Sequence, residues 1–340
     1  MYKIYLYKED FNEATSFYID IIRKSLVRMG ENVDIVYSLD SLNNDDVVIT
    51  IQAMAFAEVW LRRNRKRNII NWYQGIVPEE AMCLFEKSIS RYFRYWLWCL
   101  LERIALKNAK RNIFVSEAML THYQQKYNYK KENYFIMPCF NQELRLSSFS
   151  EEKYRTPSFV YAGSLSRWQC VEETLVLYKG IKRRLPDASL TILTKEIDKA
   201  KMLCDKYEVE ATVKFVPSAE LQDTLSCYKY GFIVRDDIAV NNVATPTKMN
   251  SYMAAGVIPV FSDVIYDFKK NFYGLKYVIP FLHSDEAIEK ILKIEKNGIN
   301  CEDIKFEYKK IFDSYYSTDC YIEPLGHFLQ VNGGTDNQIK

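Results

Sequence analysis

The sequence of 340 residues lacks the short motifs that identify several enzyme classes. It contains no G-x-x-x-x-G-K-[ST], no G-x-G-x-x-G and no G-x-S-x-G. These absences argue against a P-loop ATPase, a dinucleotide oxidoreductase and a serine esterase. The three histidines, His122, His283 and His327, lie far apart without ligand spacing, so we expect no metal site and no metallohydrolase.

Cysteine pairs, long apolar runs and a strong net charge are also missing. Eight cysteines are scattered without a C-x-x-C pair, which indicates reduced thiols of a cytosolic protein. No run approaches the ~18 apolar residues that a membrane span requires, and the start lacks the apolar core of a signal peptide. A net charge of +2 gives no overall attraction to nucleic acid. We therefore expect a cytoplasmic location.

The chain is long and rich in aromatic residues. Its 340 residues suggest two domains, each large enough to bury a core of its own. Hydrophobic residues make up 48% and charged residues 26%, as in soluble globular proteins. Aromatic residues reach 15%, which fits either flat sugar-binding surfaces or biased codon usage, and we favour the second explanation.

Short β-rich runs alternate with helical stretches in two blocks. This alternation predicts an α/β fold with two Rossmann-like parallel-sheet domains that face each other across a cleft. We expect domains at residues 1–150 and 151–325, the last helix of the second packing back on the first, and a tail at residues 326–340. A polar stretch at residues 141–157 is expected to link the domains, and residues 301–316 to form the last helix. The predicted strands are residues 3–7, 33–38, 46–51, 68–73, 112–116, 134–138, 158–164, 189–194, 213–216, 230–235 and 257–262.

The most informative segment is residues 231–262, GFIVRDDIAVNNVATPTKMNSYMAAGVIPVFS. It predicts a strand, a polar loop, a helix opened by Pro246 and ended by Gly256, and a second strand. A helix that starts beyond the carboxyl end of a strand presents unpaired N–H groups to an anion. Thr247 and Lys248 add a hydroxyl and an ammonium there. The alternative is an ordinary capped core helix with Lys248 in solvent.

Two further loops lie at the same predicted sheet edge. After the strand at residues 158–164, Gly163 permits a sharp turn, Arg167 suits a diphosphate and Trp168 can stack on a base or sugar. The alternative is a surface arginine beside a packed tryptophan. The strand at residues 230–235 ends with Arg235 and is followed by Asp236, which a solvated turn could explain, although their position at this edge favours a ligand role. Asn242 is a further hydrogen-bonding candidate, for which an ordinary turn is the favoured explanation.

The first block contains one candidate segment, residues 71–80. Gly75 permits a close approach of a ligand, and Gln74 can hydrogen bond to a hydroxyl. Glu79 and Glu80 are candidate bases, although glutamates in a first helical turn also stabilise the helix without any catalytic role.

Basic residues gather in residues 62–67 and, mixed with Tyr, Phe and Trp, in residues 88–112. An apolar helix face flanked by Lys and Arg can lie in a membrane interface. A core helix with solvated ends explains residues 88–112 equally well, and single-stranded nucleic acid is a weaker candidate because no nucleic-acid motif accompanies them.

Taken together, these segments resemble a bacterial glycosyltransferase of the GT-B fold, close to glycosyltransferase family 4 and its relatives in surface-polysaccharide synthesis. The resemblance covers most of the chain. WYQGIVPEE, VSEAM and IMPCFN resemble landmarks of the acceptor domain. YAGSLSRWQ, FIVRDD and TPTKMNSYMAAGVIPV resemble those of the donor domain.

The resemblance implies transfer of a sugar from a nucleotide-diphosphate donor, a UDP- or GDP-sugar, to a saccharide or lipid-linked acceptor. It also implies retention of configuration, no required cofactor or metal, and a location in the cytoplasm, with a peripheral contact at the inner membrane face as a further expectation. The implied catalytic residues are Arg235, Lys248 and Arg167. The implied donor-binding residues are Gly163, Ser164, Trp168, Asp236, Asn242, Pro246, Thr247, Ser251 and Tyr252, and the acceptor residues are Gln74, Gly75, Glu79 and Glu80.

The sequence departs from the family pattern in three places. Many relatives have a glutamate before the tyrosine of the donor helix, where this chain has Ser251, and another eight residues earlier, where it has Val243. The usual lysine after the donor-loop strand is replaced near Gln169. These departures keep open a non-catalytic carbohydrate- or partner-binding subunit of the same fold. A sugar-nucleotide epimerase is a third alternative, which three scattered histidines disfavour.

Overall fold

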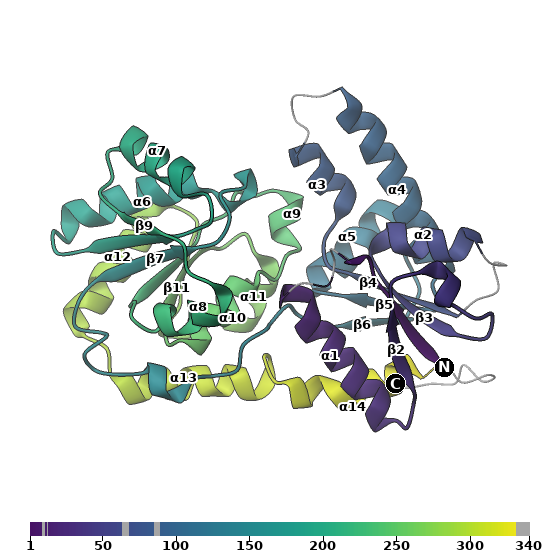
Figure 1. Cartoon of the computed structure of the whole chain (residues 1–340). Coiled ribbons are helices and arrows are strands. Elements are labelled where there is room, and N and C mark those ends of the chain that lie inside the picture. Colours follow the sequence, from purple (N-terminus) through teal and green to yellow (C-terminus); the bar gives the residue numbers. More distant parts are fainter. Residues whose placement is uncertain (9–10, 12, 63–67, 85–88, 331–340) are drawn as a thin grey trace. The chain divides into compact units, whose positions relative to one another are not determined.

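The structure is a computed structural model that describes residues 1–8, 11, 13–62, 68–84 and 89–330. The chain forms two compact units, which we describe separately (Figure 1). Unit 1 comprises Met1–Pro138 and Ser317–Lys340, and unit 2 comprises Cys139–Tyr316. Residues 139–150, expected in the first domain, therefore lie in unit 2, and residues 317–325, expected in the second, lie in unit 1.

Unit 1 alternates strands and helices from its first residues. Its elements are β1 (Tyr2–Tyr5), α1 (Glu13–Arg28), β2 (Val33–Val36), the short helix η2 (Leu39–Ser41), β3 (Val47–Ile51), α2 (Gln52–Arg62), β4 (Ile69–Tyr73), α3 (Val77–Leu84), α4 (Ser90–Asn108), β5 (Arg111–Phe114), α5 (Glu117–Tyr127), β6 (Tyr134–Ile136) and α14 (Thr318–Leu329).

Unit 2 repeats the alternation. Its elements are η3 (Leu146–Ser148), β7 (Ser158–Ala162), η4 (Arg167–Gln169), α6 (Val171–Arg184), β8 (Ser189–Leu193), α7 (Ile197–Tyr207), β9 (Thr212–Lys214), α8 (Ser218–Leu225), β10 (Tyr230–Ile233), α9 (Ala239–Asn242), α10 (Thr247–Ala254), β11 (Ile258–Ser262), α11 (Tyr266–Phe272), β12 (Ile279–Phe281), α12 (Ser284–Asn297) and α13 (Cys301–Ser314).

Each unit has one six-stranded parallel sheet. The strand order is β2-β1-β3-β4-β5-β6 in unit 1 and β12-β11-β10-β7-β8-β9 in unit 2. Helices cover both faces of each sheet (Figure 1). In unit 2, α6 contacts α7 and α12 on one face, and α8 contacts α10 on the other. Both orders reverse direction once, so each sheet has a point where adjacent loops diverge and leave space for a ligand.

The predicted strands are confirmed as β1 to β11. Most of them are buried apolar runs, whereas β2, β6 and β9 are partly exposed. The strand β12 was not predicted, since it has only three residues and contains Pro280. The expectation that residues 301–316 form the last helix is wrong: α13 is followed by α14, so residues 326–329 are helical too. No described helix is long and apolar enough to cross a membrane.

Much of the aromatic content lies in the cores of the two sheets. In unit 2, Phe159 stacks on Tyr230 and Phe232 with ring centroids 4.7 and 5.4 Å apart. In unit 1, the ring of Tyr73 lies 5.3 Å from those of Phe114 and Tyr123. Tyrosine therefore serves here largely as a large core residue, in agreement with the compositional explanation favoured from the sequence.

The helix α14 completes unit 1 by packing along α1. Gly326 makes this contact possible, because a Cβ atom there would lie 2.8 Å from the backbone carbonyl oxygen of Ser25. The end of α14 is fixed by a hydrogen bond of 3.0 Å from the Tyr2 hydroxyl to the Leu329 carbonyl. Arg111 donates a hydrogen bond of 3.0 Å to the carbonyl of Gln330 and lies over the Phe328 ring.

We expect Gly326→Ala to destabilise unit 1, although alanine is the better helix former by about 1 kcal/mol. The clash with a backbone carbonyl cannot be relieved by a side-chain rotation, and overpacking of this kind costs about 1–3 kcal/mol. Urea unfolding followed by circular dichroism measures the effect.

Gly180→Ala in α6 is the matched control. Its Cβ would also meet an atom at 2.8 Å, but that atom is Cδ1 of Ile288, the end of a flexible side chain. This variant should unfold at the same or a higher urea concentration than the wild type. A Gly326→Ala protein as stable as the wild type would show that α14 does not need this close approach to α1.

Candidate functional site

The candidate site of unit 2 lies where its strand order reverses. The strands β7 and β10 are neighbours in the sheet, with Tyr230 opposite Phe159 and Gly231 opposite Val160. The chain leaves β7 toward β8 on one side and leaves β10 toward β11 on the other. The loops after β7 and β10 therefore meet at one carboxyl edge, the usual ligand position in such sheets.

Two basic side chains meet at this edge and share one neutral acceptor. The Oε1 atom of Gln169 accepts a hydrogen bond of 2.7 Å from Nη2 of Arg235 and one of 2.5 Å from Nζ of Lys248. Arg235 is 6% exposed, and Lys248 is half-buried. The three residues come from β10's end, α10's first turn and η4, so the fold assembles them from distant parts of the sequence.

Arg235 and Lys248 have only neutral hydrogen-bond partners in the part of the chain that the structure describes. Within the described part of the chain, neither Arg235 nor Lys248 forms an ion pair with a carboxylate. Burial and the nearby Arg235 guanidinium hold the pKa of Lys248 well below its usual value. Charging both groups side by side without a counterion is costly, and an anion beside them would lower that cost.

Gly163 leaves room for Lys248. Its φ of +142° is unfavourable for other residues, and a Cβ atom there would lie 2.7 Å from Cε and 2.8 Å from Nζ of Lys248. The Lys248 ammonium also lies 4.3 Å from the centre of the Tyr161 ring and 3.2 Å from its hydroxyl. The residues Tyr161, Gly163, Gln169 and Lys248 thus form one contact group.

The loop after β7 is held from its other side by α7. The backbone N–H of Leu165 donates a hydrogen bond of 2.6 Å to Oε2 of Glu196, and Lys199 donates one of 2.9 Å to the Leu165 carbonyl. Ser164 and Arg167 in this loop are exposed, and Trp168 is half-buried. These three predicted donor residues thus lie just before Gln169 in the sequence, and the side chains of Ser164 and Arg167 are on the surface of the loop.

The helix α10 begins at Thr247, with Pro246 as its N-cap. Pro246, Thr247 and Lys248 are half-buried, and no side chain caps the helix. The first N–H groups of α10 are therefore available to a ligand. The helix is fixed by Asn250, whose Oδ1 accepts hydrogen bonds from the backbone N–H groups of Asn141 (2.9 Å) and Gln142 (2.8 Å).

Tyr252 lies inside the fold. It is fully buried, and its hydroxyl accepts a hydrogen bond of 3.0 Å from the N–H of Ala162 and donates one of 3.4 Å to the Phe232 carbonyl. A Cβ atom at Gly231 would lie 2.5 Å from the Tyr252 ring. In the structure, Tyr252 thus supports the ends of β7 and β10, and sequence reasoning missed the need for a glycine at residue 231.

The remaining donor candidates lie between β10 and α10. Asp236 is exposed, and Asn242 is half-buried and donates hydrogen bonds of 2.8 Å to Asp237 and 3.0 Å to the Val264 carbonyl. Val243 and Ser251, at the two usual glutamate positions, are 4% and 9% exposed. The described site therefore has no carboxylate at either of these positions.

In unit 1, the predicted acceptor residues lie together at the end of β4. Gln74, Gly75, Glu79 and Glu80 are all half-buried. The Glu80 carboxyl lies over Gly75, where a Cβ atom would be 2.0 Å from its Oε1. Burial raises the pKa of Glu80, and the Glu79 charge raises it further. A hydrogen bond from the Ile76 backbone acts against this rise. Nε2 of Gln74 is buried without a hydrogen-bond partner among the described residues.

Glu79 belongs to a charged network that sequence reasoning missed. Lys126 lies 2.7 Å from Glu79 and 3.5 Å from the buried Glu102, and His122 lies 3.5 Å from Glu79. Burial favours a higher pKa for Glu79, but the hydrogen bonds from His122 and Lys126 lower it below its usual value. Burial raises the pKa of Glu102 to about 7. This network fixes Glu79 against α5 and leaves Glu80 as the more basic carboxylate.

A further feature of unit 1 is the backbone of Gln52. This residue follows β3 directly and has a φ of +67°, which is uncommon for a residue other than glycine. Its Oε1 atom has no hydrogen-bond partner in the described ranges. Strained backbone with an unsatisfied amide indicates a functional position, and no sequence pattern could have predicted it.

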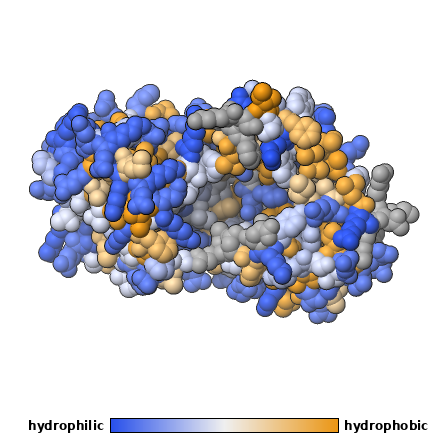
Figure 2. Space-filling model, turned by 45° about the horizontal axis from the view of Figure 1, so that its top comes forward, coloured by the Kyte–Doolittle hydropathy of each residue, from blue (hydrophilic) through white to orange (hydrophobic). Residues whose placement is uncertain are grey.

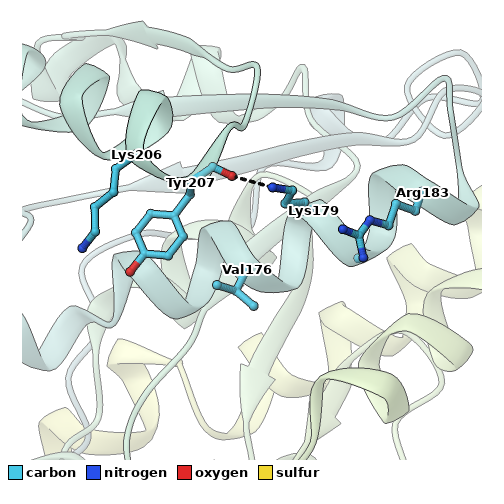
Figure 3. Close-up of a pocket in the computed structure, with 6 residues that line it drawn as sticks. Val176, Lys179, Arg183, Lys206 and Tyr207 are labelled. Atoms are coloured by element: carbon cyan, nitrogen blue, oxygen red, sulfur yellow. Dashed lines mark hydrogen bonds between the residues drawn. The ribbon is translucent and has the colours of Figure 1, made fainter.

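A shallow pocket in unit 2 lies between α6 and α7 (Figure 3). Lys179 in this pocket donates a hydrogen bond of 3.1 Å to the Tyr207 carbonyl and lies 2.8 Å from Glu208, and Lys206 lies 2.8 Å from Glu172. These lysines have carboxylate partners, in contrast to Arg235 and Lys248. No group of three or more metal-ligating side chains is found among the described residues.

No protein-family model matches the chain, and no curated protein matches it in sequence. Several solved structures match its fold. TarM is 13% identical with a TM-score of 0.66, and the match covers 86% of this chain and 56% of TarM. A mutant of S. aureus TarM in complex with fondaparinux, α-GlcNAc-glycerol and UDP is 14% identical with a TM-score of 0.61, covering 83% and 55% of the two chains.

A third match is a trehalose-6-phosphate synthase, studied with bisubstrate glycomimetics for glycosyltransfer with retention. It is 9% identical with a TM-score of 0.59, and the match covers 94% of this chain and 86% of the synthase. The chain thus spans little more than half the length of the TarM structures. These neighbours are glycosyltransferases of the GT-B fold, and with its two parallel six-stranded sheets the chain shares that fold.

Proposed function

We propose that the protein is a glycosyltransferase that uses a nucleotide-diphosphate sugar, with the diphosphate bound at Arg235 and Lys248. The observation that carries this proposal is the shared hydrogen bonding of both cations to Gln169 without a carboxylate partner. A diphosphate would supply the missing negative charge and accept hydrogen bonds from both groups. The structural neighbours support the same reaction class, and one of them contains UDP.

In the proposed reaction, the bond between the anomeric carbon and the β-phosphate oxygen of the donor breaks. The acceptor hydroxyl oxygen forms the new bond to that carbon, and its proton leaves to a phosphate oxygen or a base. Negative charge grows on the departing diphosphate, where Arg235 and Lys248 stabilise it. Because these cations neutralise the diphosphate themselves, we propose that no metal ion is required, and we propose retention of configuration.

The other donor contacts follow from the positions described above. We propose that Gly163, Ser164 and Arg167 line the diphosphate and that Trp168 stacks on the base or sugar. Pro246 and Thr247 place the start of α10 at the phosphates. Ser251 and Tyr252 support the site from inside the fold. The side chains of Asp236 and Asn242 are proposed to contact a UDP- or GDP-sugar.

We propose that unit 1 binds the acceptor at the end of β4. Gln74 would use its free amide to hydrogen bond a hydroxyl, and Gly75 allows the acceptor to approach the backbone. Glu80, the more basic carboxylate beside Glu79, is the proposed base. The acceptor is a saccharide or lipid-linked saccharide of bacterial surface glycan synthesis, and we place the reaction in the cytoplasm with a peripheral contact at the inner membrane face.

A second candidate is a carbohydrate- or partner-binding subunit that has kept the fold without catalysis. Val243 and Ser251 favour it, because they leave the site without carboxylates at the two positions where many glycosyltransferases of family 4 have them. Turnover of a nucleotide sugar, even by slow hydrolysis, would exclude this candidate. Product analysis by NMR distinguishes transfer from epimerisation.

We expect Lys248→Met to weaken UDP binding by about 1.5–3 kcal/mol, the range for a hydrogen bond to a charged group. The same change should leave the free energy of unfolding unchanged or raise it, because it removes an amine whose charge is disfavoured beside Arg235. Isothermal titration calorimetry with UDP, GDP and CMP measures the first effect, and urea unfolding measures the second.

Lys206→Met is the control, because Lys206 is an exposed lysine of the same unit that is paired with Glu172 at 2.8 Å. Its UDP affinity should equal that of the wild type. If the wild type binds none of the three nucleotides, the proposal fails. If Lys248→Met loses stability and keeps its UDP affinity, Lys248 has a structural role only.

Nucleotide binding should take up protons, since the pKa of Lys248 is depressed in the free protein and a diphosphate beside it raises this pKa. Above the free-state pKa the lysine must gain a proton to bind, so UDP affinity should fall as pH rises. Titrations from about pH 7.5 to about pH 9.5 avoid the second phosphate pKa near 6.

The number of protons is measured by repeating the calorimetry in buffers of different ionisation enthalpy. The observed binding enthalpy of the wild type should change with the buffer, and that of Lys248→Met should not. Equal buffer dependence in both proteins would assign the proton uptake to another group.

A further inference from the structure

The helix α4 presents an apolar stripe to solvent. Ile89 just before the helix is 89% exposed, and Phe93, Trp96 and Leu100 are 73%, 71% and 55% exposed. These residues are spaced by three or four positions, so they lie on one face of a helix with 3.6 residues per turn. Hydrophobic residues gather on the upper right of the surface in Figure 2, over the part that belongs to unit 1.

The same face becomes basic toward the end of the helix. Arg103 and Lys107 continue the spacing of the stripe, and both are exposed. Arg94, beside the stripe, is exposed too. The helix has a single acidic residue, Glu102, and this residue is 1% exposed on the opposite face. The solvent-facing side of α4 therefore combines large apolar side chains with positive charge only.

The opposite face of α4 is already occupied. The helix packs against α2 and α3, and its buried residues are Glu102, Ala105 and Leu106. Unit 1 therefore does not need the stripe for its core. Four large apolar side chains in a row on a surface helix are costly in water and mark an interaction site.

We propose that this face of α4 inserts into the headgroup region of an anionic lipid bilayer. The stripe would enter the acyl boundary at the start of α4, and Arg103 and Lys107 would contact lipid phosphates from the end of the helix. Tyr92 and Trp96 are amphipathic rings of the kind found at such boundaries. Positive charge without exposed carboxylates fits an anionic leaflet.

This face of α4 would make the membrane contact that the proposed function includes, and anionic lipids would be its partners. This contact does not depend on nucleotide chemistry, so it is tested without nucleotide, and Lys248→Met should bind vesicles as the wild type does. Either proposal can then fail alone. The second basic stretch found in the sequence, residues 62–67, lies outside the described ranges from residue 63 on.

The first test is co-sedimentation with vesicles of phosphatidylglycerol and phosphatidylcholine. The wild type should bind these vesicles, bind pure phosphatidylcholine far less, and lose binding as salt rises. The double variant Phe93→Ser, Trp96→Ser should bind roughly tenfold more weakly or worse, because two exposed aromatic side chains no longer leave water. Phe306→Ser in α13 is its control, as Phe306 is 62% exposed in unit 2.

The role of charge is tested with the double variant Arg103→Gln, Lys107→Gln. Its control is the double variant Lys201→Gln, Lys214→Gln, which removes two exposed positive charges from unit 2. Only the variant Arg103→Gln, Lys107→Gln should reduce vesicle binding and the salt dependence of that binding. Brominated acyl chains should quench tryptophan fluorescence in the wild type, and Trp96→Phe should remove most of this quenching. Circular dichroism confirms that each variant is folded.

Three results would overturn the inference. The wild type could remain in the supernatant with anionic vesicles at low salt. The α4 variants and their controls in unit 2 could bind equally well. The wild type could instead form a dimer that Phe93→Ser, Trp96→Ser dissolves while neither protein binds vesicles, which would make this face a protein interface.

Discussion

The site of unit 2 depends on one shared hydrogen-bond acceptor, the amide oxygen of Gln169. It holds the Arg235 guanidinium at 2.7 Å and the Lys248 ammonium at 2.5 Å, yet it offers only a dipole against two charges. The two side chains keep this arrangement because neighbouring residues restrict them. Gly163 has no side chain to displace Lys248, and the Tyr161 ring faces the ammonium at 4.3 Å. The protein thus holds Arg235 and Lys248 close together, where a bound anion would neutralise their charge.

The fold beneath the site is built to hold this arrangement. Tyr252 reaches from α10 across the sheet to the backbone of Ala162 and Phe232, which ties the ends of β7 and β10 to the helix that carries Lys248. This reach requires a glycine at residue 231, directly below the ring. Asn250, two residues earlier in α10, fixes the helix to the backbone of residues 141 and 142. The first turn of α10 therefore has little freedom, and a site that is held in place loses less entropy when a ligand binds.

The sequence predicted the strands because each is a short apolar run, and it predicted the sheet edge because parallel strands end together. Arg235 and Lys248 were proposed from position alone, as the first charged residues after a strand and in a helix, and their role stays a prediction. Gln169 was noted only as a replacement for a lysine, and its contact with both cations was not predicted, because nothing in its neighbours along the chain reveals a partner 66 or 79 residues away. The strained Gln52, Gly231 and the Glu79–Lys126–Glu102 network were missed for the same reason. The helix α14 was missed because Pro324 and Gly326 interrupt its pattern.

Two buried lysines of unit 2, Lys153 and Lys229, differ from Lys248 in their partners. Lys229 is 2% exposed and lies 2.7 Å from Glu295, so its charge is neutralised by the protein. Lys153 has no carboxylate partner among the described residues, and burial lowers its pKa to about 7. It donates hydrogen bonds to the carbonyls of Ser148 and of Ala255, the residue just after the end of α10. The carboxyl end of a helix favours a cation. Lys248 lies in the first turn of the same helix, where the dipole disfavours a cation and the unpaired N–H groups favour an anion. Lys248 thus lies beside an arginine at the positive end of a helix, with only the Gln169 oxygen and the Tyr161 side chain as partners among the described residues, and a negatively charged ligand there would stabilise its charged form.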